Sequence, residues 1–89
     1  MPLQREIPMP KVLDKVRHGF DVYTYTRDEH PPAHCHVWSG DQEAVVELDP
    51  VRIRGSSGLH SRDLKKVLAL IEEHQEQLLE VWDSIFPRR

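Results

Sequence analysis

Residues 62–86 read RDLKKVLALIEEHQEQLLEVWDSIF and carry the strongest structural signal in the chain. Apolar side chains recur there in steps of three, four or seven residues, which is typical of an amphipathic helix. Ser61 is a suitable N-cap and Pro87 marks the stop. One continuous helix over this stretch would be about 37 Å long at 1.5 Å per residue. We therefore expect its end to overhang the sheet and to offer a surface for a homodimer.

A polar interruption falls in the middle of this apolar seam, at Gln75 with His74 beside it. A polar residue at a seam position can fix the register of a helix pair. Alternatively, this turn of the helix reaches the rim of the sheet, where tertiary context decides the residue. The sequence leaves both interpretations open.

The residues before the helix favour β-strands. Residues 20–26 are rich in aromatic and β-branched side chains, and residues 34–38 and 43–48 read as a hairpin with a loop of three to five residues. Residues 51–54 are a candidate fourth, edge strand, and Gly55–Gly58 reads as a flexible connection. The pattern predicts an α+β fold: a three- or four-stranded antiparallel sheet packed against one long C-terminal helix.

The chain length of 89 residues favours a single domain. We place this domain at residues 19–89 and an N-terminal arm at residues 1–18, because prolines 2, 8 and 10 disfavour regular structure there. Within the arm, residues 11–18 fit either one or two helical turns or a first strand.

Composition restricts the partners and the compartment. The formal net charge is -3 and no basic stripe is visible, so we expect no nucleic-acid partner. Cys35 is the one cysteine, which rules out an internal disulfide. No apolar run approaches the roughly 18 residues that span a membrane, and the first residues lack the apolar run of a signal peptide. These features predict a cytoplasmic protein without a membrane partner.

Residues 28–37 hold three of the six histidines, together with two carboxylates and the thiol. Positions i and i+2 of a strand share a face, so His34 and His36 project in parallel, about 6.6 Å apart at the backbone. Both can then reach one zinc ion at about 2.0–2.1 Å. His30 precedes a double proline that can fold it back over the strand. The sequence predicts a divalent metal site, such as zinc, at His30, His34 and His36.

The neighbours of these histidines have different expected roles. Asp28 or Glu29 can add an oxygen ligand or orient a histidine from behind. Cys35 points to the opposite face and is expected in the core. His60, just before the helix, joins the cluster only if that helix end packs over the hairpin; otherwise it is a solvated loop residue. His74 is expected at a rim.

Three interpretations of the cluster stay open, since His-x3-His-x-His is not one of the strong zinc spacings. A metal with an open position can activate water for hydrolysis. A histidine pair without metal can act as acid and base, as in RNA cleavage. Finally, the histidines can be structural or contact a partner, beside Trp38. No dinucleotide, Walker or nucleophile-elbow motif is visible in the sequence.

Several segments resemble one family of small bacterial proteins of unknown function, DUF4160, which is marked by a P-P-H-x-H-V motif and a C-terminal helix with a leucine pair and a tryptophan. The resemblance covers roughly residues 20–86. It rests on residues 29–37, 44–48, 49–52, Leu59, 62–64, 71–74 and 78–82. The chain departs from the pattern in Ala33 before the first motif histidine, in Cys35 between the two, and in its longer arm.

The resemblance implies a compact α+β unit in a bacterial cytoplasm, encoded beside another small protein as in a toxin–antitoxin-like or regulatory pair. Together with the cluster, it leads us to expect a small binding or regulatory module with a partner protein and a histidine metal site. The alternative is a small metal- or histidine-dependent hydrolase or ribonuclease. The family implies no established activity.

Overall fold

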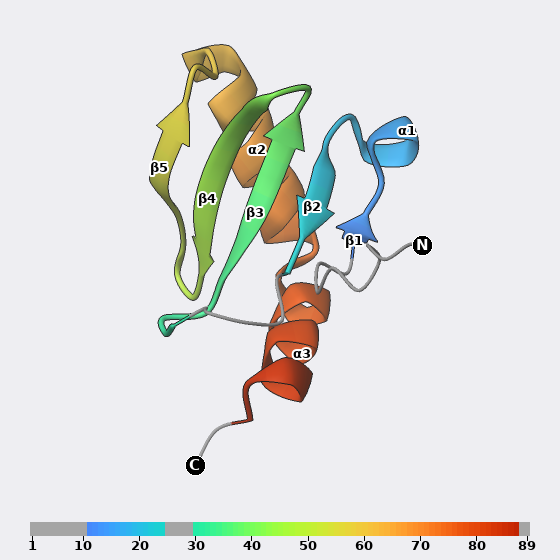
Figure 1. Ribbon diagram of the computed structural model, residues 1–89, viewed down its shortest axis with the longest axis vertical. Coiled ribbons are helices and arrows are strands. Elements are labelled where there is room, and N and C mark those ends of the chain that lie inside the picture. Colours follow the sequence, from blue (N-terminus) through green and yellow to red (C-terminus); the bar gives the residue numbers. More distant parts are fainter. Residues whose placement is uncertain (1–10, 25–29, 88–89) are drawn as a thin grey trace, which may run out of the picture.

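The chain folds into one antiparallel sheet with its two longer helices on one side (Figure 1). The structure, a computed structural model, describes residues 11–24 and 30–87, and only the backbone of residue 16. The elements are β1 (Lys11–Leu13), α1 (Lys15–His18), β2 (Asp21–Tyr23), β3 (His34–Ser39), β4 (Gln42–Leu48), β5 (Val51–Ser57), α2 (Ser61–Glu73) and α3 (Gln75–Ile85). The predicted α+β class is confirmed.

Within the described residues, the sheet contains five strands in the order β1-β2-β3-β4-β5, so the prediction of three or four is wrong. At one edge, β1 pairs with β2. At the other, β5 continues through Gly55–Ser57, so the prediction of a flexible connection there is wrong. Glycine and serine have low strand propensity, but pairing with β4 decides their conformation.

The β3–β4 hairpin is tighter than predicted. Ser39 pairs with Gln42, so Gly40 and Asp41 alone form the turn, in place of three to five residues. Gly40 has a φ of 64°, a left-handed conformation that glycine adopts without steric cost. This turn fixes which side chains of the two strands share a face.

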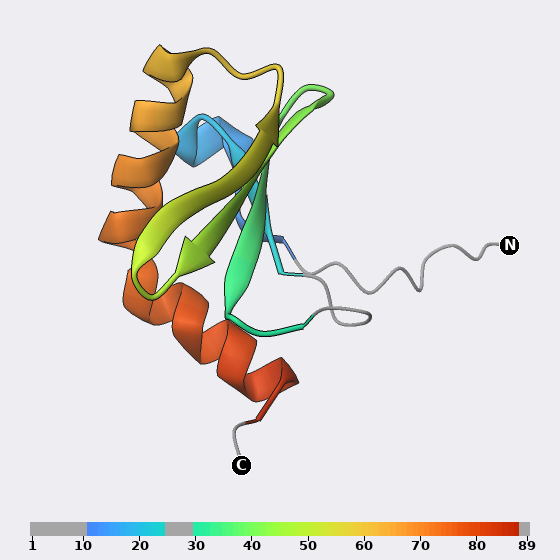
Figure 2. The same cartoon turned by 90° about the vertical axis from the view of Figure 1, so that its left-hand side faces the viewer.

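The core lies between the sheet and the two longer helices, which form a separate layer in the side view (Figure 2). Alternate residues of β3 and β4 supply one side of it, and the apolar seams of α2 and α3 supply the other. Its fully buried residues include Val22, Cys35, Val37, Ala44, Val46, Leu48, Val67, Ile71 and Leu78. The core role predicted for Cys35 is therefore confirmed.

The predicted continuous helix is wrong, because the chain breaks at His74 between α2 and α3. His74 has φ −112° and ψ 19°, and its Nδ1 donates to the carbonyl of Leu70 at 3.0 Å. Gln75 donates from Nε2 to the carbonyl of Leu48, at the end of β4, at 2.6 Å. This contact agrees with the interpretation that Gln75 reaches the rim of the sheet. The N-cap of α2 is His60, whereas Ser61 is the first helical residue.

Because of the break, α3 turns beneath the end of the sheet (Figure 2). Its residues Leu78 and Trp82 are buried within the chain itself. The part of the seam that was expected to overhang therefore contributes to the core, and a homodimer through the C-terminal helix stays a prediction.

The predicted arm and domain are described in part. Residues 1–10 lie outside the described residues, while residues 11–18 contain β1 and α1. The boundary at residue 18 stays a prediction. In the described ranges, no helix combines the length and apolar character needed to cross a bilayer.

Asp21 predicts an acid-dependent contribution to stability. Its carboxylate accepts the backbone N–H of Lys15 at 2.7 Å and pairs with Lys11 at 3.3 Å. These contacts, the backbone bond foremost, lower the pKa of Asp21 in the folded state. A lowered folded pKa means that the contribution is complete above the ordinary carboxyl pKa and is lost as the pH falls through the folded value.

We therefore expect Asp21→Asn to be less stable than the wild type at pH 7, with the difference shrinking below about pH 4. Urea unfolding at a series of pH values measures both free energies. A difference that stays constant down to pH 2 would contradict the expectation, and Asp41→Asn, on the exposed hairpin turn, is the matched control.

Candidate functional site

The candidate site lies on the face of the sheet opposite α2. In β3, Cys35 and Val37 enter the core, so the alternate residues His34 and His36 project from the other face. His36 pairs with Tyr23 on β2 and with Val45 on β4. The central strand of the sheet thus sets the position of both histidines.

The two imidazole rings lie side by side, as predicted. The ring centroids of His34 and His36 are 5.3 Å apart, with an interplanar angle of 67°. His34 is buried at 3% exposure, and the side chain of His36 is 12% exposed. The pair is therefore largely removed from water, where electrostatic contacts are stronger than in bulk solvent.

An oxygen acceptor orients each ring through its Nδ1 atom. His36 Nδ1 lies 2.8 Å from Oε2 of Glu43, and His34 Nδ1 lies 2.9 Å from the carbonyl of Pro32. Carboxylate and carbonyl oxygens can only accept, so both Nδ1 atoms carry hydrogen. In the neutral tautomer of each ring, the lone pair is then on Nε2.

Arg54 extends this arrangement from β5. Its Nη2 donates to the Pro32 carbonyl at 3.4 Å and lies 3.4 Å from His34 Nδ1. His34 Nδ1 and Arg54 Nη2 both donate to the Pro32 carbonyl. We therefore interpret their closeness to each other as the result of this shared acceptor. The Pro32 carbonyl thus links the loop, the buried histidine and the edge strand.

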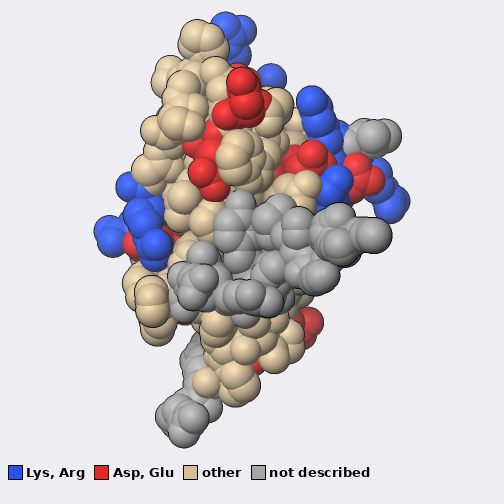
Figure 3. Space-filling view, viewed as in Figure 1, with Lys and Arg blue, Asp and Glu red and all other residues tan. Residues whose placement is uncertain are grey.

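An acidic residue of β4 holds two arginines at this edge. Glu47 accepts from Arg52 Nε at 2.7 Å and from Arg54 Nε at 3.2 Å. The bond from Arg52 is the main cause that lowers the pKa of Glu47; burial opposes it and Arg54 adds to it. Figure 3 views this face and, among the described residues, shows acidic and basic side chains near one another. The edge is therefore an ion-pair cluster in which one carboxylate pairs with two guanidinium groups.

The three predicted histidines line one cavity of about 370 Å³. Its lining residues are His30, Pro31, Pro32, His34, His36, Val45, Glu47 and Arg54. Of the three histidines, His30 is the exposed one. The described residues contain no group of three His, Cys, Asp or Glu side chains close enough to hold a metal, and Asp28 and Glu29 lie outside them. The metal site at His30, His34 and His36 stays a prediction.

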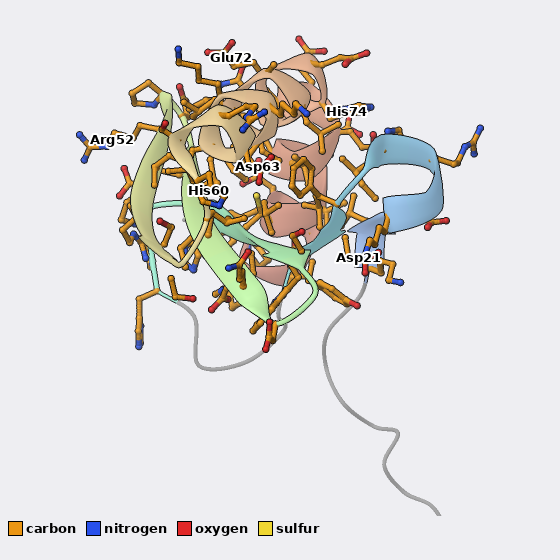
Figure 4. All side chains as sticks on the ribbon, turned by 90° about the horizontal axis from the view of Figure 1, so that it is seen from above. Asp21, Arg52, His60, Asp63, Glu72 and His74 are labelled. Atoms are coloured by element: carbon orange, nitrogen blue, oxygen red, sulfur yellow. The ribbon has the colours of Figure 1, made fainter. Side chains whose placement is uncertain are left out.

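Other candidates take no part in this cavity. Burial raises the pKa of the Cys35 thiol to about 12, so it is not a thiolate ligand at neutral pH. His60 is exposed at the start of α2 and His74 packs against the ring of His18 at 5.1 Å. Figure 4 shows His74 on the helical side of the molecule, away from Arg52 at the sheet edge. His60 therefore does not join the cluster, and the rim position of His74 agrees with expectation.

Sequence reasoning missed the groups that orient the histidines. Glu43, Glu47 and Arg54 come from β4 and β5, and Trp82 of α3 packs against His34 with ring centroids 5.0 Å apart. The alternation of Glu43, Val45 and Glu47 along one predicted strand was a usable signal. Pairing that face with the histidine face of the hairpin places these carboxylates beside the rings.

The fold and cavity define a small α+β domain whose sheet face carries a histidine pair held by hydrogen bonds. The chain belongs to the family described as Domain of unknown function (DUF4160), whose profile matches residues 19–83. The resemblance seen in the sequence is thus confirmed. Comparison with the curated proteins and with the solved structures gives no match.

Proposed function

We propose that this protein is a small binding module of the bacterial cytoplasm that holds a divalent metal, zinc in the first instance, through His34 and His36. In this proposal it acts as one member of a two-protein regulatory pair, as in toxin–antitoxin systems. The metal-bearing cavity is where the partner protein is recognised.

The observation that carries the proposal is the orientation of the two rings. Metal-binding histidines almost always donate from their second ring nitrogen to a carboxylate or carbonyl, which fixes the tautomer and raises the basicity of the ligand. Both forms of this contact are present: His36 donates to the carboxylate of Glu43, and His34 donates to the carbonyl of Pro32. Two adjacent rings of one strand have this support, as a pair of metal ligands would.

Two histidines alone bind zinc weakly, since zinc sites in proteins usually have three or four protein ligands. His30 lines the same cavity and is the first candidate for the third ligand, with Asp28 or Glu29 as oxygen donors. The fourth position is open to water or to a side chain of the partner. The proposal thus accounts for three histidines in one short segment.

Titration of the untagged full chain with Zn²⁺ by calorimetry tests the proposal. We expect one ion per chain, and a rise in the midpoint of thermal unfolding that EDTA reverses, because a ligand that binds only the folded state stabilises it. The matched variant His60→Ala, which lacks an exposed histidine outside the cavity, should bind equally well. Sub-stoichiometric zinc, or a stoichiometry that falls in His60→Ala, would sink the proposal.

A second candidate function, a histidine-dependent hydrolase or ribonuclease, is favoured by the His36–Glu43 contact of 2.8 Å beside His34 and Arg54. A carboxylate that holds an imidazole in one tautomer is the arrangement of a general base, and a nearby guanidinium stabilises anionic oxygens. Turnover of an RNA oligonucleotide that is lost in His36→Ala, with the fold retained, would support this function. Absence of turnover in the metal-loaded and metal-free chain would exclude it.

A further inference from the structure

The side of α2 that faces away from the sheet is exposed along most of the helix. It is formed by Ala69 and by the four charged residues that lie three or four positions from it, a spacing that places side chains on one face of a helix. These residues are Lys65, Lys66, Ala69, Glu72 and Glu73, and all five are exposed. Figure 4 shows Glu72 on the side of the helix away from the sheet. We call these five residues the outer α2 face.

The charges of the outer α2 face are divided by sign along the helix. Lys65 and Lys66 lie before Ala69, whereas Glu72 and Glu73 lie after it. Ion pairs within one helix need a spacing of three or four residues, so the two groups do not neutralise each other. Within the described residues, none of the four charged side chains has an ion-pair partner within 4.0 Å.

The helix itself does not favour this order of charges. Glu72 and Glu73 belong to the last turn of α2, which contains no basic residue. The C-terminal end of a helix carries partial negative charge, so anions are unfavourable there and cations are favourable. Neither the helix nor an ion pair within the described fold therefore accounts for the two glutamates.

The order of charges is complementary to a second copy of the same face. When two α2 helices pack antiparallel about a two-fold axis at Ala69, each residue faces the residue at the same distance on the other side of Ala69. Lys66 and Glu72 are both three positions from Ala69, and Lys65 and Glu73 are both four. Each lysine of one copy thus faces a glutamate of the other.

We propose that the outer α2 face is the interface of a reversible homodimer. The small side chain of Ala69 at its centre lets the two helices approach closely, and the half-buried Leu68 and Leu70 flank it with apolar surface. The 13 residues of α2 span about 20 Å at 1.5 Å per residue, so the contact is smaller than that of a permanent dimer. In Figure 2, α3 turns beneath the sheet and leaves this face clear.

The dimer determines how the histidine cavities are presented. Each cavity is on the face of the sheet opposite α2, so two copies joined through α2 have their cavities on opposite outer sides. One dimer can then engage two partner molecules or one partner with two binding segments. The inference does not rest on a metal, because no residue of the outer α2 face lines the cavity.

Sedimentation equilibrium of the untagged full chain, from about 10 µM to 1 mM, tests the proposal. We expect a dimer whose dissociation constant rises at least about tenfold in Lys65→Glu/Lys66→Glu and in Glu72→Lys/Glu73→Lys, because each variant opposes like charges. The two variants change the net charge in opposite directions, so a general charge effect would not weaken both. Lysine and glutamate have similar helix propensities, and circular dichroism checks that the fold is retained.

The variant that combines all four exchanges is the decisive control. It has the net charge of the wild type, and each lysine again faces a glutamate, so it should dimerise as the wild type does. A wild-type chain that stays monomeric over the whole concentration range would overturn the proposal. So would a dimer that neither double variant weakens, or a fourfold variant that stays monomeric.

A cysteine placed on the two-fold axis reports the geometry directly. Ala69→Cys should form a disulfide-linked dimer under diamide much faster than Asp41→Cys, because residue 69 of one copy meets residue 69 of the other. The buried thiol of Cys35 does not compete. Equal rates of cross-linking in the two variants would contradict an axis at Ala69.

Discussion

Replacing Ile71 with alanine is expected to lower the free energy of unfolding by about 2–5 kcal/mol, the range for large-to-small changes in a core. Ile71 is fully buried on α2, where the helix seam meets the sheet. The truncation removes apolar contacts and leaves a cavity that the sheet cannot fill, because its strands are held by their own hydrogen bonds. Small domains have a stability of only about 5–15 kcal/mol, so a large share of it would be lost.

Urea unfolding followed by tryptophan fluorescence measures this change, since Trp82 packs in the same helical layer. Ile71→Val, which removes one methylene group, should cost about 0.5–1.5 kcal/mol. Lys65→Ala, on the exposed face of the same helix, should change stability by less than about 0.5 kcal/mol. Equal effects of Ile71→Ala and Lys65→Ala would mean that α2 does not cover the sheet as described.

The alternation of residue types predicted which faces of the sheet and helices are buried. Val37, Val46 and Ile71 occupy the core positions that a period of two or of 3.6 residues assigns to them. Local pattern did not predict the end of each element, because long-range pairing decides it. Gly55 belongs to β5 because it pairs with Val45 of β4. The helix breaks at His74, next to Gln75, which donates to the Leu48 carbonyl.

The candidate site was predictable to the extent that it is local. The two-residue spacing of His34 and His36 was sufficient to bring their rings together. The groups that hold them come from more distant parts of the chain, for instance Glu43 across the hairpin and Trp82 from α3. A single sequence does not reveal such contacts until strand register and helix position are known.

Removing a ligand by His36→Ala is expected to weaken zinc binding at least about 100-fold, more than the loss of a contact that only supports a ligand. Glu43→Ala should weaken zinc binding less, by about 10–100-fold, because Glu43 contacts Nδ1 of His36 and not the Nε2 atom that would bind the metal. Without this carboxylate, the ring loses the contact that fixes its tautomer and orientation. A purely structural histidine pair would show no such gradation between the two variants.

Competition with a chromophoric zinc chelator measures the affinities of both variants under identical buffer conditions. Asp41→Ala is the matched control for Glu43→Ala, since Asp41 is an exposed acidic residue two positions earlier on the same hairpin. It removes the same charge without touching His36, so any general electrostatic effect on zinc appears in both variants. An equal loss of affinity in Asp41→Ala and Glu43→Ala would show that Glu43 acts through its charge alone. Among the described contacts, Glu43 accepts a hydrogen bond of 2.8 Å from His36, and Asp41 has no such contact with that ring. A larger loss of zinc affinity in Glu43→Ala than in Asp41→Ala therefore supports a role of Glu43 in orienting the ligand.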